Sequence, residues 1–317
     1  MSTGNGRAST FRRLQDAALA EAGVDVTSRF VDVSTPLLRV HLLEAGEGDP
    51  VLMVHGGNSV AASWAPLIAP LATQFHLLMP DRPGCGLTSG FDYRGIDLRG
   101  HGVAFLNGLV TALGCGRVAL VGNSMGGFFA LAFALAHPES VSKLVLLGEP
   151  AGADGDPGLF HRLIGTRGVN TLLYATALRP PREAAGTRAG LRRSHLVADP
   201  DRVPEPLLQC LTAGARLPGA VHSWTTMVER AFDPPGLGLV AKKTTITHAL
   251  LPELRNLATP TLFLWGDKDP FGSPGVGRML AQEMPDARLQ VIEDAGHLPW
   301  LDRPEYCAEG IAGFLGS

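Results

Sequence analysis

The sequence predicts an α/β protein, in which helices cover both faces of a mostly parallel sheet and a helical cap is inserted. Apolar runs of four to seven residues recur along the chain, and segments of helical length separate most of them. Such runs are typical of parallel strands that are buried on both faces. Between residues 149 and about 258 this alternation stops, which indicates an insertion of about 100 residues.

Composition narrows the class of protein further. The chain has 317 residues, 27 basic and 30 acidic, a net charge of −3, and 45% hydrophobic residues. This balance argues against a disordered chain and against a basic nucleic-acid-coating protein. Its four cysteines are widely spaced, so we expect reduced thiols in a cytoplasmic protein.

The first predicted elements precede the parallel part of the sheet. A helix is expected over residues 10–22, with Thr10 as its N-cap, and the charges in this segment argue against a signal peptide. Alternating patterns predict hairpin strands over residues 28–33 and 37–43, and the apolar run 51–54 predicts a buried third strand.

The remaining elements complete the sheet and the cap. Further strands are expected over residues 75–79, 117–121, 143–147, 261–265 and 288–292. Helical patterns over residues 207–215 and 221–232 lie within the insertion. The predicted domains are a first core part with the N-terminal helix (1–150), a helical cap (151–248) and a second core part (249–317).

One uncharged segment is long enough to span a membrane, but glycines and polar residues interrupt it. Residues 118–138 carry no charge. The run Gly122-Asn123-Ser124-Met125-Gly126-Gly127 divides the segment, and it suits a tight turn between two buried elements better than a continuous helix. We therefore expect no membrane partner.

The same turn contains a candidate nucleophile. Gly122, Ser124 and Gly126 form a Gly-x-Ser-x-Gly pattern between a predicted strand and a helix over residues 127–136. The glycines permit a sharp turn that exposes the serine hydroxyl above the sheet. The following N–H groups lie at the positive end of the helix, where negative charge on a substrate is stabilised.

A serine hydroxyl needs a general base, which in turn needs a carboxylate to orient it. His297 follows the last apolar run and is the expected base. Asp267 and Asp269 both follow the run 261–265, and Glu149 follows the run 143–147. We favour Asp269, which lies farther past its strand and leaves room for a helix and a strand before His297, with Asp267 bracing the turn.

An anionic tetrahedral intermediate needs hydrogen-bond donors near the nucleophile. The segment His55-Gly56-Gly57-Asn58 follows the third strand, and its glycines let a backbone N–H approach the substrate. Gly57 and Met125 are the expected oxyanion donors, each worth about 3 to 4 kcal/mol in the barrier. His55 is expected to hold this loop by hydrogen bonds without transferring protons.

Taken together, five motifs resemble those of the α/β-hydrolase superfamily. They are His55-Gly56-Gly57, residues 80–89, the serine turn, Trp265-Gly266-Asp267-Lys268-Asp269 and Gly296-His297. The order serine, aspartate, histidine is also that of the family. The resemblance implies an eight-stranded, mostly parallel sheet with antiparallel first strands and a helical cap after the sixth strand.

The motifs divide between two subfamilies. The serine turn resembles that of the carbon-carbon bond hydrolases that split meta-cleavage products. Those enzymes usually carry a tryptophan where this chain has Leu298, and the loop after Gly56 lacks their Gly-Pro-Gly run. The segment His297-Leu298-Pro299-Trp300 is more similar to esterases and lactonases. A serine nucleophile argues against haloalkane dehalogenases and epoxide hydrolases, which carry aspartate there.

The sequence indicates a substrate class only broadly. The candidate pocket residues are Asn58, Trp64, Phe128, Trp224, Met227 and Trp300. An apolar cleft of this kind suits a medium-sized hydrophobic group. The cap also carries arginines, any of which is a candidate for capturing a carboxylate: Arg162, Arg167, Arg179, Arg182, Arg188, Arg192, Arg193 and Arg202.

These observations predict a serine hydrolase of a carboxylic ester, lactone or thioester. The first alternative is carbon-carbon bond hydrolysis of a vinylogous diketone by the same three residues. The second is a ligand-binding homologue without turnover. We expect a small-molecule substrate, no cofactor, no metal and no nucleic acid, in a monomer or homodimer.

Overall fold

A single eight-stranded sheet organises the protein. The computed structural model describes residues 2–155, 159–232 and 245–317. The strands lie in the order β1-β2-β4-β3-β5-β6-β7-β8. They are β1 (Val26–Ser34), β2 (Leu37–Ala45), β3 (Asp49–Val54), β4 (Phe75–Pro80), β5 (Val118–Asn123), β6 (Val141–Leu147), β7 (Thr261–Gly266) and β8 (Ala287–Ile292). β2 pairs antiparallel with β1 and β4, and the other pairs are parallel. The predicted fold class is confirmed.

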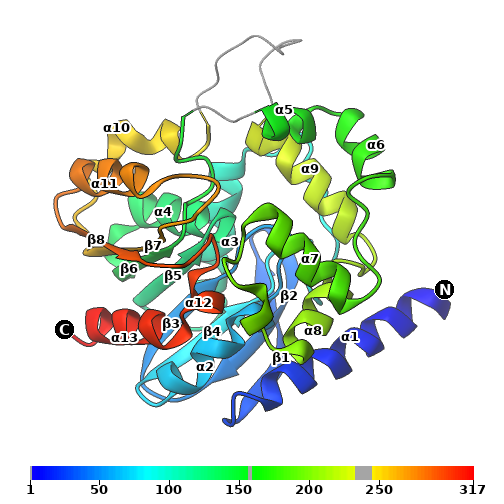
Figure 1. Cartoon of the computed structure of the whole chain (residues 1–317). Helices are drawn as coiled ribbons and strands as arrows, with labels where there is room; N and C mark the ends of the chain where they lie inside the picture. Colours follow the sequence, from blue (N-terminus) through cyan, green and yellow to red (C-terminus); the bar gives the residue numbers. More distant parts are fainter. Residues whose placement is uncertain (1, 156–158, 233–244) are drawn as a thin grey trace.

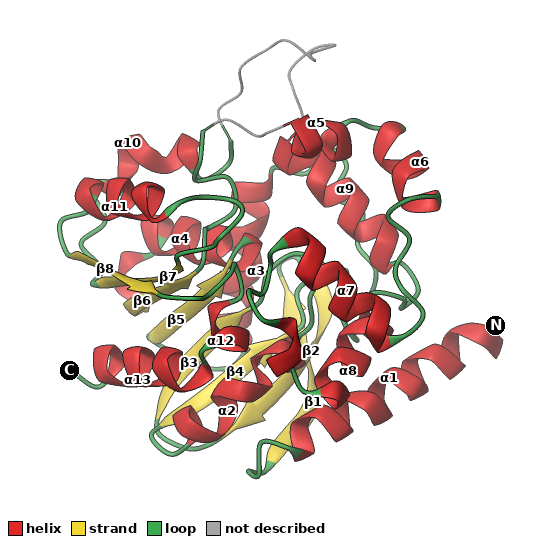
Figure 2. Cartoon of the chain, in the orientation of Figure 1, coloured by secondary structure: helices red, strands yellow, loops and turns green. Residues whose placement is uncertain are grey.

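Helices cover both faces of this sheet (Figures 1 and 2). Those packed on the sheet include α2 (Ala65–Ala72), α3 (Leu98–Ala112), α4 (Met125–Ala136), α11 (Pro274–Glu283), α12 (Pro299–Asp302) and α13 (Pro304–Leu315). Strand β5 shows why two layers form. Its side chains alternate between two hydrophobic clusters, Val118 and Leu120 in one and Ala119 and Val121 in the other.

The described part of the chain between β6 and β7 includes the helices of the cap and one further short helix. It contains α5 (Leu159–Gly165), α6 (Val169–Ala175), α7 (Ala184–Ser194), α8 (Glu205–Gly214), α9 (Ala220–Phe232) and the short α10 (Leu251–Leu254). Helices α5 to α9 lie together above the strand ends (Figure 1). One anchor between cap and core is Asp302, which accepts hydrogen bonds from the backbone N–H groups of Ala198 and Asp199.

The N-terminal helix is longer than its sequence pattern predicts. Helix α1 spans Ser2–Ala20, so the prediction of Thr10 as N-cap is wrong. The Thr10 hydroxyl instead donates to the carbonyl of Gly6, one turn earlier, as a threonine inside a helix does. Burial of Phe11 and the packing of α1 on α8 stabilise the helix through contacts that the local sequence does not show.

Two further expectations concern membranes and cysteines. Within the described ranges, no helix combines the length and apolar character needed to cross a bilayer. The uncharged segment 118–138 is divided between β5 and α4. All four cysteines are free thiols.

The close approach of α4 to β3 gives a first testable prediction. A Cβ atom on Gly126 would collide with the backbone carbonyl of Val54 and lie 2.5 Å from that of His55. Gly126→Ala should therefore lower the free energy of unfolding by at least about 2 kcal/mol. Chemical denaturation measures this change.

Gly190 on α7 is a matched control, because a Cβ atom there meets nothing within 4 Å. Gly190→Ala should raise the free energy of unfolding by about 0.4 to 1 kcal/mol. Equal stability of Gly126→Ala and the wild type would contradict the packing described here.

Candidate active site

Ser124 lies in a tight turn between β5 and α4 that has a strained backbone conformation. Its backbone has φ 52° and ψ −119°, a conformation that residues with a Cβ atom rarely adopt. The flanking glycines allow the turn, because a Cβ atom on Gly122 would lie 2.8 Å from the Cα atom of Gly127. The half-buried serine thus stands at the carboxyl end of a central strand and at the N-terminus of a helix.

Asp269 and His297 form a buried pair at neighbouring strand ends. His297 Nδ1 lies 2.9 Å from Asp269 Oδ2, and the side chains are 3% and 0% exposed. Asp269 also accepts hydrogen bonds from the backbone N–H groups of Glu149 and Phe271. These bonds fix the carboxylate, which in turn orients the imidazole with Nδ1 as the donor.

The other two candidate carboxylates have different partners. Asp267 accepts a hydrogen bond from the backbone N–H of Ala295 and so braces the turn. Glu149 Oε1 accepts hydrogen bonds from the N–H groups of Ala153 and Asp154. Burial raises the pKa of Glu149 well above its usual range, and the nearby charge of Asp269 raises it further. Glu149 therefore keeps its proton to a higher pH than an exposed glutamate does, and its Oε1 is bonded to the backbone and not to the imidazole.

The histidine loop is tied to the residue that precedes the serine. Asn123 Nδ2 donates to the carbonyl of His297 at 3.1 Å and to that of Leu147 at 2.8 Å. His297 Nε2 is buried and has no hydrogen-bond partner within the described ranges. Sequence reasoning did not assign Asn123 a role. Its position next to the nucleophile was the available signal, but its partners come from two distant strand ends.

The two predicted oxyanion donors, Gly57 and Met125, come from the loop after β3 and from the start of α4. Met125 is the first residue of α4, and the loop containing Gly57 passes close to the serine. A Cβ atom on Gly56 would lie 3.1 Å from Ser124 Cβ. Neither the Gly57 N–H nor the Met125 N–H donates to another group in the part of the chain that the structure describes.

His55 and Arg82 hold this loop in place. His55 Nδ1 donates to the Gly56 carbonyl, and its Nε2 accepts from the backbone N–H of Arg82. The buried Arg82 guanidinium donates to the carbonyls of His55 and Gly56. Burial, reinforced by the Arg82 charge, lowers the pKa of His55 to about 3, so the ring stays neutral. Arg82 is a second site residue to which sequence reasoning gave no role.

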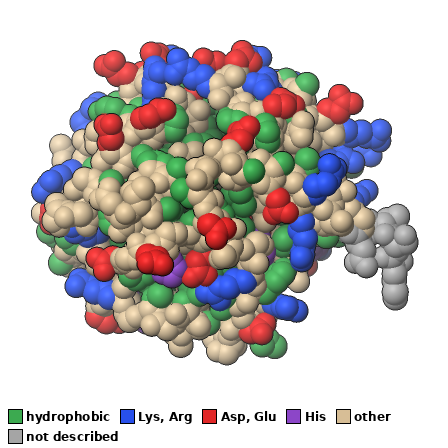
Figure 3. All heavy atoms as spheres, turned by 90° about the horizontal axis from the view of Figure 1, so that it is seen from below, with side chains coloured by type: hydrophobic (Ala, Val, Ile, Leu, Met, Phe, Trp, Pro, Cys, Tyr) green, Lys and Arg blue, Asp and Glu red, His purple; other side chains and the backbone are tan. Residues whose placement is uncertain are grey.

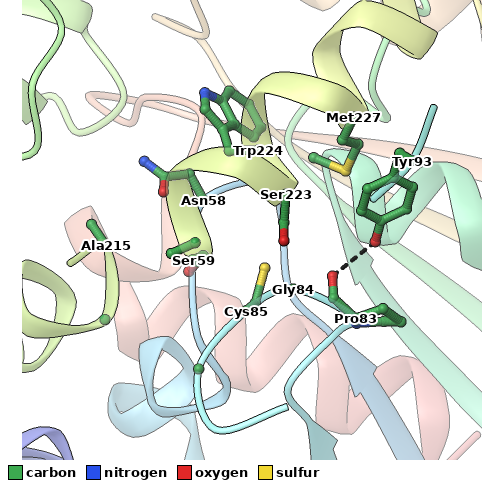
Figure 4. Close-up of a pocket in the computed structure, with 13 residues that line it drawn as sticks. Asn58, Ser59, Pro83, Gly84, Cys85, Tyr93, Ala215, Ser223, Trp224 and Met227 are labelled. Carbon is green, nitrogen blue, oxygen red and sulfur yellow. Dashed lines mark hydrogen bonds between the residues drawn. The ribbon is translucent and has the colours of Figure 1, made fainter. Parts of the chain in front are cut away.

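A small cavity lies between cap helix α9 and the loops after β3 and β4, and neither Ser124 nor His297 lines it (Figure 4). Asn58, Trp224 and Met227, three of the predicted pocket residues, line it, and about 10 Å³ remains free, room for one water. A Cβ atom on Gly57 would collide with the Trp224 ring. The Trp224 ring of α9 therefore lies against Gly57 in the predicted oxyanion loop.

The other three predicted pocket residues lie elsewhere. Trp64 and Trp300 are buried against each other, with ring centroids 4.4 Å apart, and Trp300 Nε1 donates to the Ser63 carbonyl. Phe128 is buried in α4. None of the three lines the cavity of Figure 4.

The described residues include no side-chain cluster typical of a metal site. They contain no group of three or more His, Cys, Asp or Glu side chains arranged to hold a metal ion. Among the described residues, His297 Nε2 and the backbone N–H groups of Gly57 and Met125 have no hydrogen-bond partner. These free groups suit proton transfer and oxyanion binding.

Known proteins resemble the chain over nearly its whole length. A family model described as the alpha/beta hydrolase fold matches residues 49–304. A 2-hydroxy-6-oxononadienedioate/2-hydroxy-6-oxononatrienedioate hydrolase of Cupriavidus pinatubonensis is 31% identical over 315 residues, 95% of this chain and 98% of the relative. A 2-hydroxy-6-oxo-6-phenylhexa-2,4-dienoate hydrolase of Burkholderia cepacia is 29% identical and covers 88% and 93%.

A solved carboxylesterase from Bacillus subtilis superposes with a TM-score of 0.73 at 20% identity, covering 98% of this chain and 99% of that one. At that identity the likeness shows the fold alone. The relatives named as hydrolases support an enzyme over the alternative of a ligand-binding homologue. From the sheet order, the serine turn and these matches together, the chain is a hydrolase that belongs to the α/β-hydrolase family.

Proposed function

We propose that the protein is a serine hydrolase that cleaves a carboxylic ester, lactone or thioester of a medium-sized hydrophobic substrate. One observation carries the proposal: a serine in a forced turn stands at the same sheet edge as a buried imidazole that a carboxylate orients. The free Nε2 of that imidazole is the atom that would accept the serine proton.

The reaction follows from these groups. Ser124 Oγ attacks the acyl carbon while His297 Nε2 takes its proton, and Asp269 stabilises the imidazolium. The backbone N–H groups of Gly57 and Met125 hold the oxyanion. His297 then protonates the leaving oxygen or sulfur, which departs and leaves an acyl-enzyme. A water that gives its proton to His297 attacks the acyl carbon, and Ser124 recovers the proton as the acid leaves.

The lining of the cavity favours a neutral substrate. None of the residues that line it carries a charge, and its surface is largely apolar. Arg82, a buried cation of the same region, already donates to two backbone carbonyls of the predicted oxyanion loop. A charged group that reached this cavity would therefore lack a partner, which favours an uncharged substrate.

The names of the relatives favour a second candidate, carbon-carbon bond hydrolysis of a vinylogous diketone. This reaction uses the same three residues but requires the substrate to ketonise before the serine or a water attacks. A dienol diketone absorbs visible light, and decay of that absorbance with enzyme would support the second candidate. A plain esterase leaves the chromophore unchanged.

The nucleophile is tested with p-nitrophenyl esters of increasing chain length. Ser124→Ala should lower turnover at least about a thousandfold, because the covalent route is lost. Ser194→Ala, which alters an exposed cap serine, is the matched control and should leave turnover unchanged. A loss below about tenfold in Ser124→Ala would refute the assignment.

The two aspartates after β7 make a second matched pair. Asp269→Asn should lower kcat about ten-thousandfold, since the imidazole loses the carboxylate that sets its tautomer. Asp267→Asn alters only the turn bond to Ala295 and should retain activity within about tenfold. The opposite ranking in steady-state assays would assign the carboxylate to Asp267.

The raised pKa of Glu149 predicts a pH dependence of stability. Its pKa is raised in the folded protein from an ordinary 4.5, so above that pH the unfolded chain releases a proton that the folded protein keeps. This site therefore destabilises the wild type increasingly as pH rises from about 4.5. Glu149→Gln does not titrate, so its Tm relative to wild type should rise between pH 5 and 8. A constant difference would show that Glu149 is ionised.

A further inference from the structure

We propose that a hollow on the cap, away from Ser124, binds a phosphate-class anion. The hollow has a volume of about 670 Å³ and is lined by Arg7, Arg179, Arg182 and Arg216. Tyr174 and two prolines complete much of its wall, and no acidic side chain lines it. Nothing in the proposed hydrolytic reaction uses these arginines, so the site stands independently of that proposal.

The charge of these four arginines is uncompensated. Within the described ranges, none of them forms an ion pair with a carboxylate. Other cap arginines differ, since Arg188, Arg192 and Arg202 pair with neighbouring acidic side chains. The face seen in Figure 3 likewise shows basic and acidic side chains interspersed. A hollow lined by cations alone has a positive potential that attracts anions.

Segments that are distant in the sequence build the hollow. Arg7 comes from α1, Arg179 and Arg182 from the chain after α6, and Arg216 from the chain after α8. Arg7 donates to the Arg216 carbonyl, and the Arg216 guanidinium donates to the carbonyls of Pro180 and Pro181. These bonds hold the walls while each guanidinium keeps further N–H donors for a ligand.

The number of arginines favours phosphate over carboxylate. One guanidinium satisfies a carboxylate through two parallel hydrogen bonds, so a carboxylate leaves most of these donors unused. A phosphate group carries a charge of about −1.5 to −2 and three acceptor oxygens, which can bridge several guanidinium groups. A diphosphate matches four arginines better still.

One wall of the hollow is connected to the candidate active site. The Tyr174 hydroxyl, which lines the hollow, accepts a hydrogen bond from Trp224 Nε1. The Trp224 ring lies over Gly57 on the other side. Trp64, Trp265 and Trp300 are almost fully buried in the core, so Trp224 is the tryptophan placed to report an anion beside Tyr174.

The test is binding of inorganic pyrophosphate at constant ionic strength, measured by calorimetry on the full-length chain and by tryptophan fluorescence. Arg179→Ala with Arg182→Ala should weaken binding at least about tenfold. Arg192→Ala with Arg202→Ala removes the same charge from ion-paired arginines of the cap and should change the Kd less than about twofold. Acetate should bind at least about tenfold more weakly than pyrophosphate.

Three outcomes would overturn the proposal: no binding to wild type, equal loss in both double variants, or acetate binding as tightly as pyrophosphate. Circular dichroism of the double variants establishes that they fold. Trp224→Phe should abolish the fluorescence change and leave the calorimetric binding intact.

Kinetics distinguish two sources of the anion once binding is established. A higher KM of the Arg179/Arg182 double variant only for esters that carry a phosphate would identify the anion as part of the substrate. An effect of free pyrophosphate on hydrolysis of a neutral ester would identify a separate ligand. Either kinetic result requires that the anion site exists. Loss of hydrolysis of every substrate would instead count against the proposed reaction and not against the anion site.

Discussion

The backbone of Ser124 is the constraint on which the rest of the site depends. A residue with a Cβ atom at φ 52° costs on the order of 1 to 3 kcal/mol, and such a conformation persists only where the surroundings enforce it. Here the enforcement is steric: α4 starts so close to β3 that only glycine fits at residue 126. The same contact brings the loop of Gly56 and Gly57 beside the serine. The strained turn at Ser124 and the predicted oxyanion loop are therefore held by the same packing contact between α4 and β3.

Charge is distributed around this turn so that one carboxylate remains available to the imidazole. Asp269 accepts hydrogen bonds from two backbone N–H groups, while burial raises the pKa of Glu149. On the opposite side, burial keeps His55 neutral, so that it can accept a hydrogen bond from the Arg82 backbone. His297 Nε2 has no hydrogen-bond partner among the described residues, and it is the atom that the proposed reaction uses for proton transfer.

The sequence predicted those features that depend on local patterns. All eight strands were predicted, the first two from alternating patterns and the other six from apolar runs, with ends displaced by up to a few residues. The start of α1 was missed because its stability comes from packing on α8. The pairing of Asp269 with His297 followed from their places after β7 and β8, and the geometry brings these two side chains together. The roles of Ser124, Gly57 and Met125 remain proposals.

Features that depend on tertiary contacts were not predicted from the sequence. Trp64 and Trp300 were predicted to line an apolar substrate pocket, yet their rings pack on each other in the core. Asn123, Arg82 and the arginine hollow each acquire their partners from segments far apart in the chain, which no local pattern encodes. The cap arginines show the same limitation of sequence-based prediction. The sequence gives their number, but only the folded structure shows which of them form ion pairs and that, among the described residues, Arg179 and Arg182 do not.

Covalent labelling by a fluorophosphonate tests the central claim most directly, because the probe reacts only with a serine that a neighbouring base activates. The account predicts a mass increase confined to the peptide that contains Ser124, and loss of labelling in His297→Ala. Absence of labelling in the folded wild type, under conditions in which a reference esterase reacts, would contradict it, as would equal labelling of the His297→Ala variant.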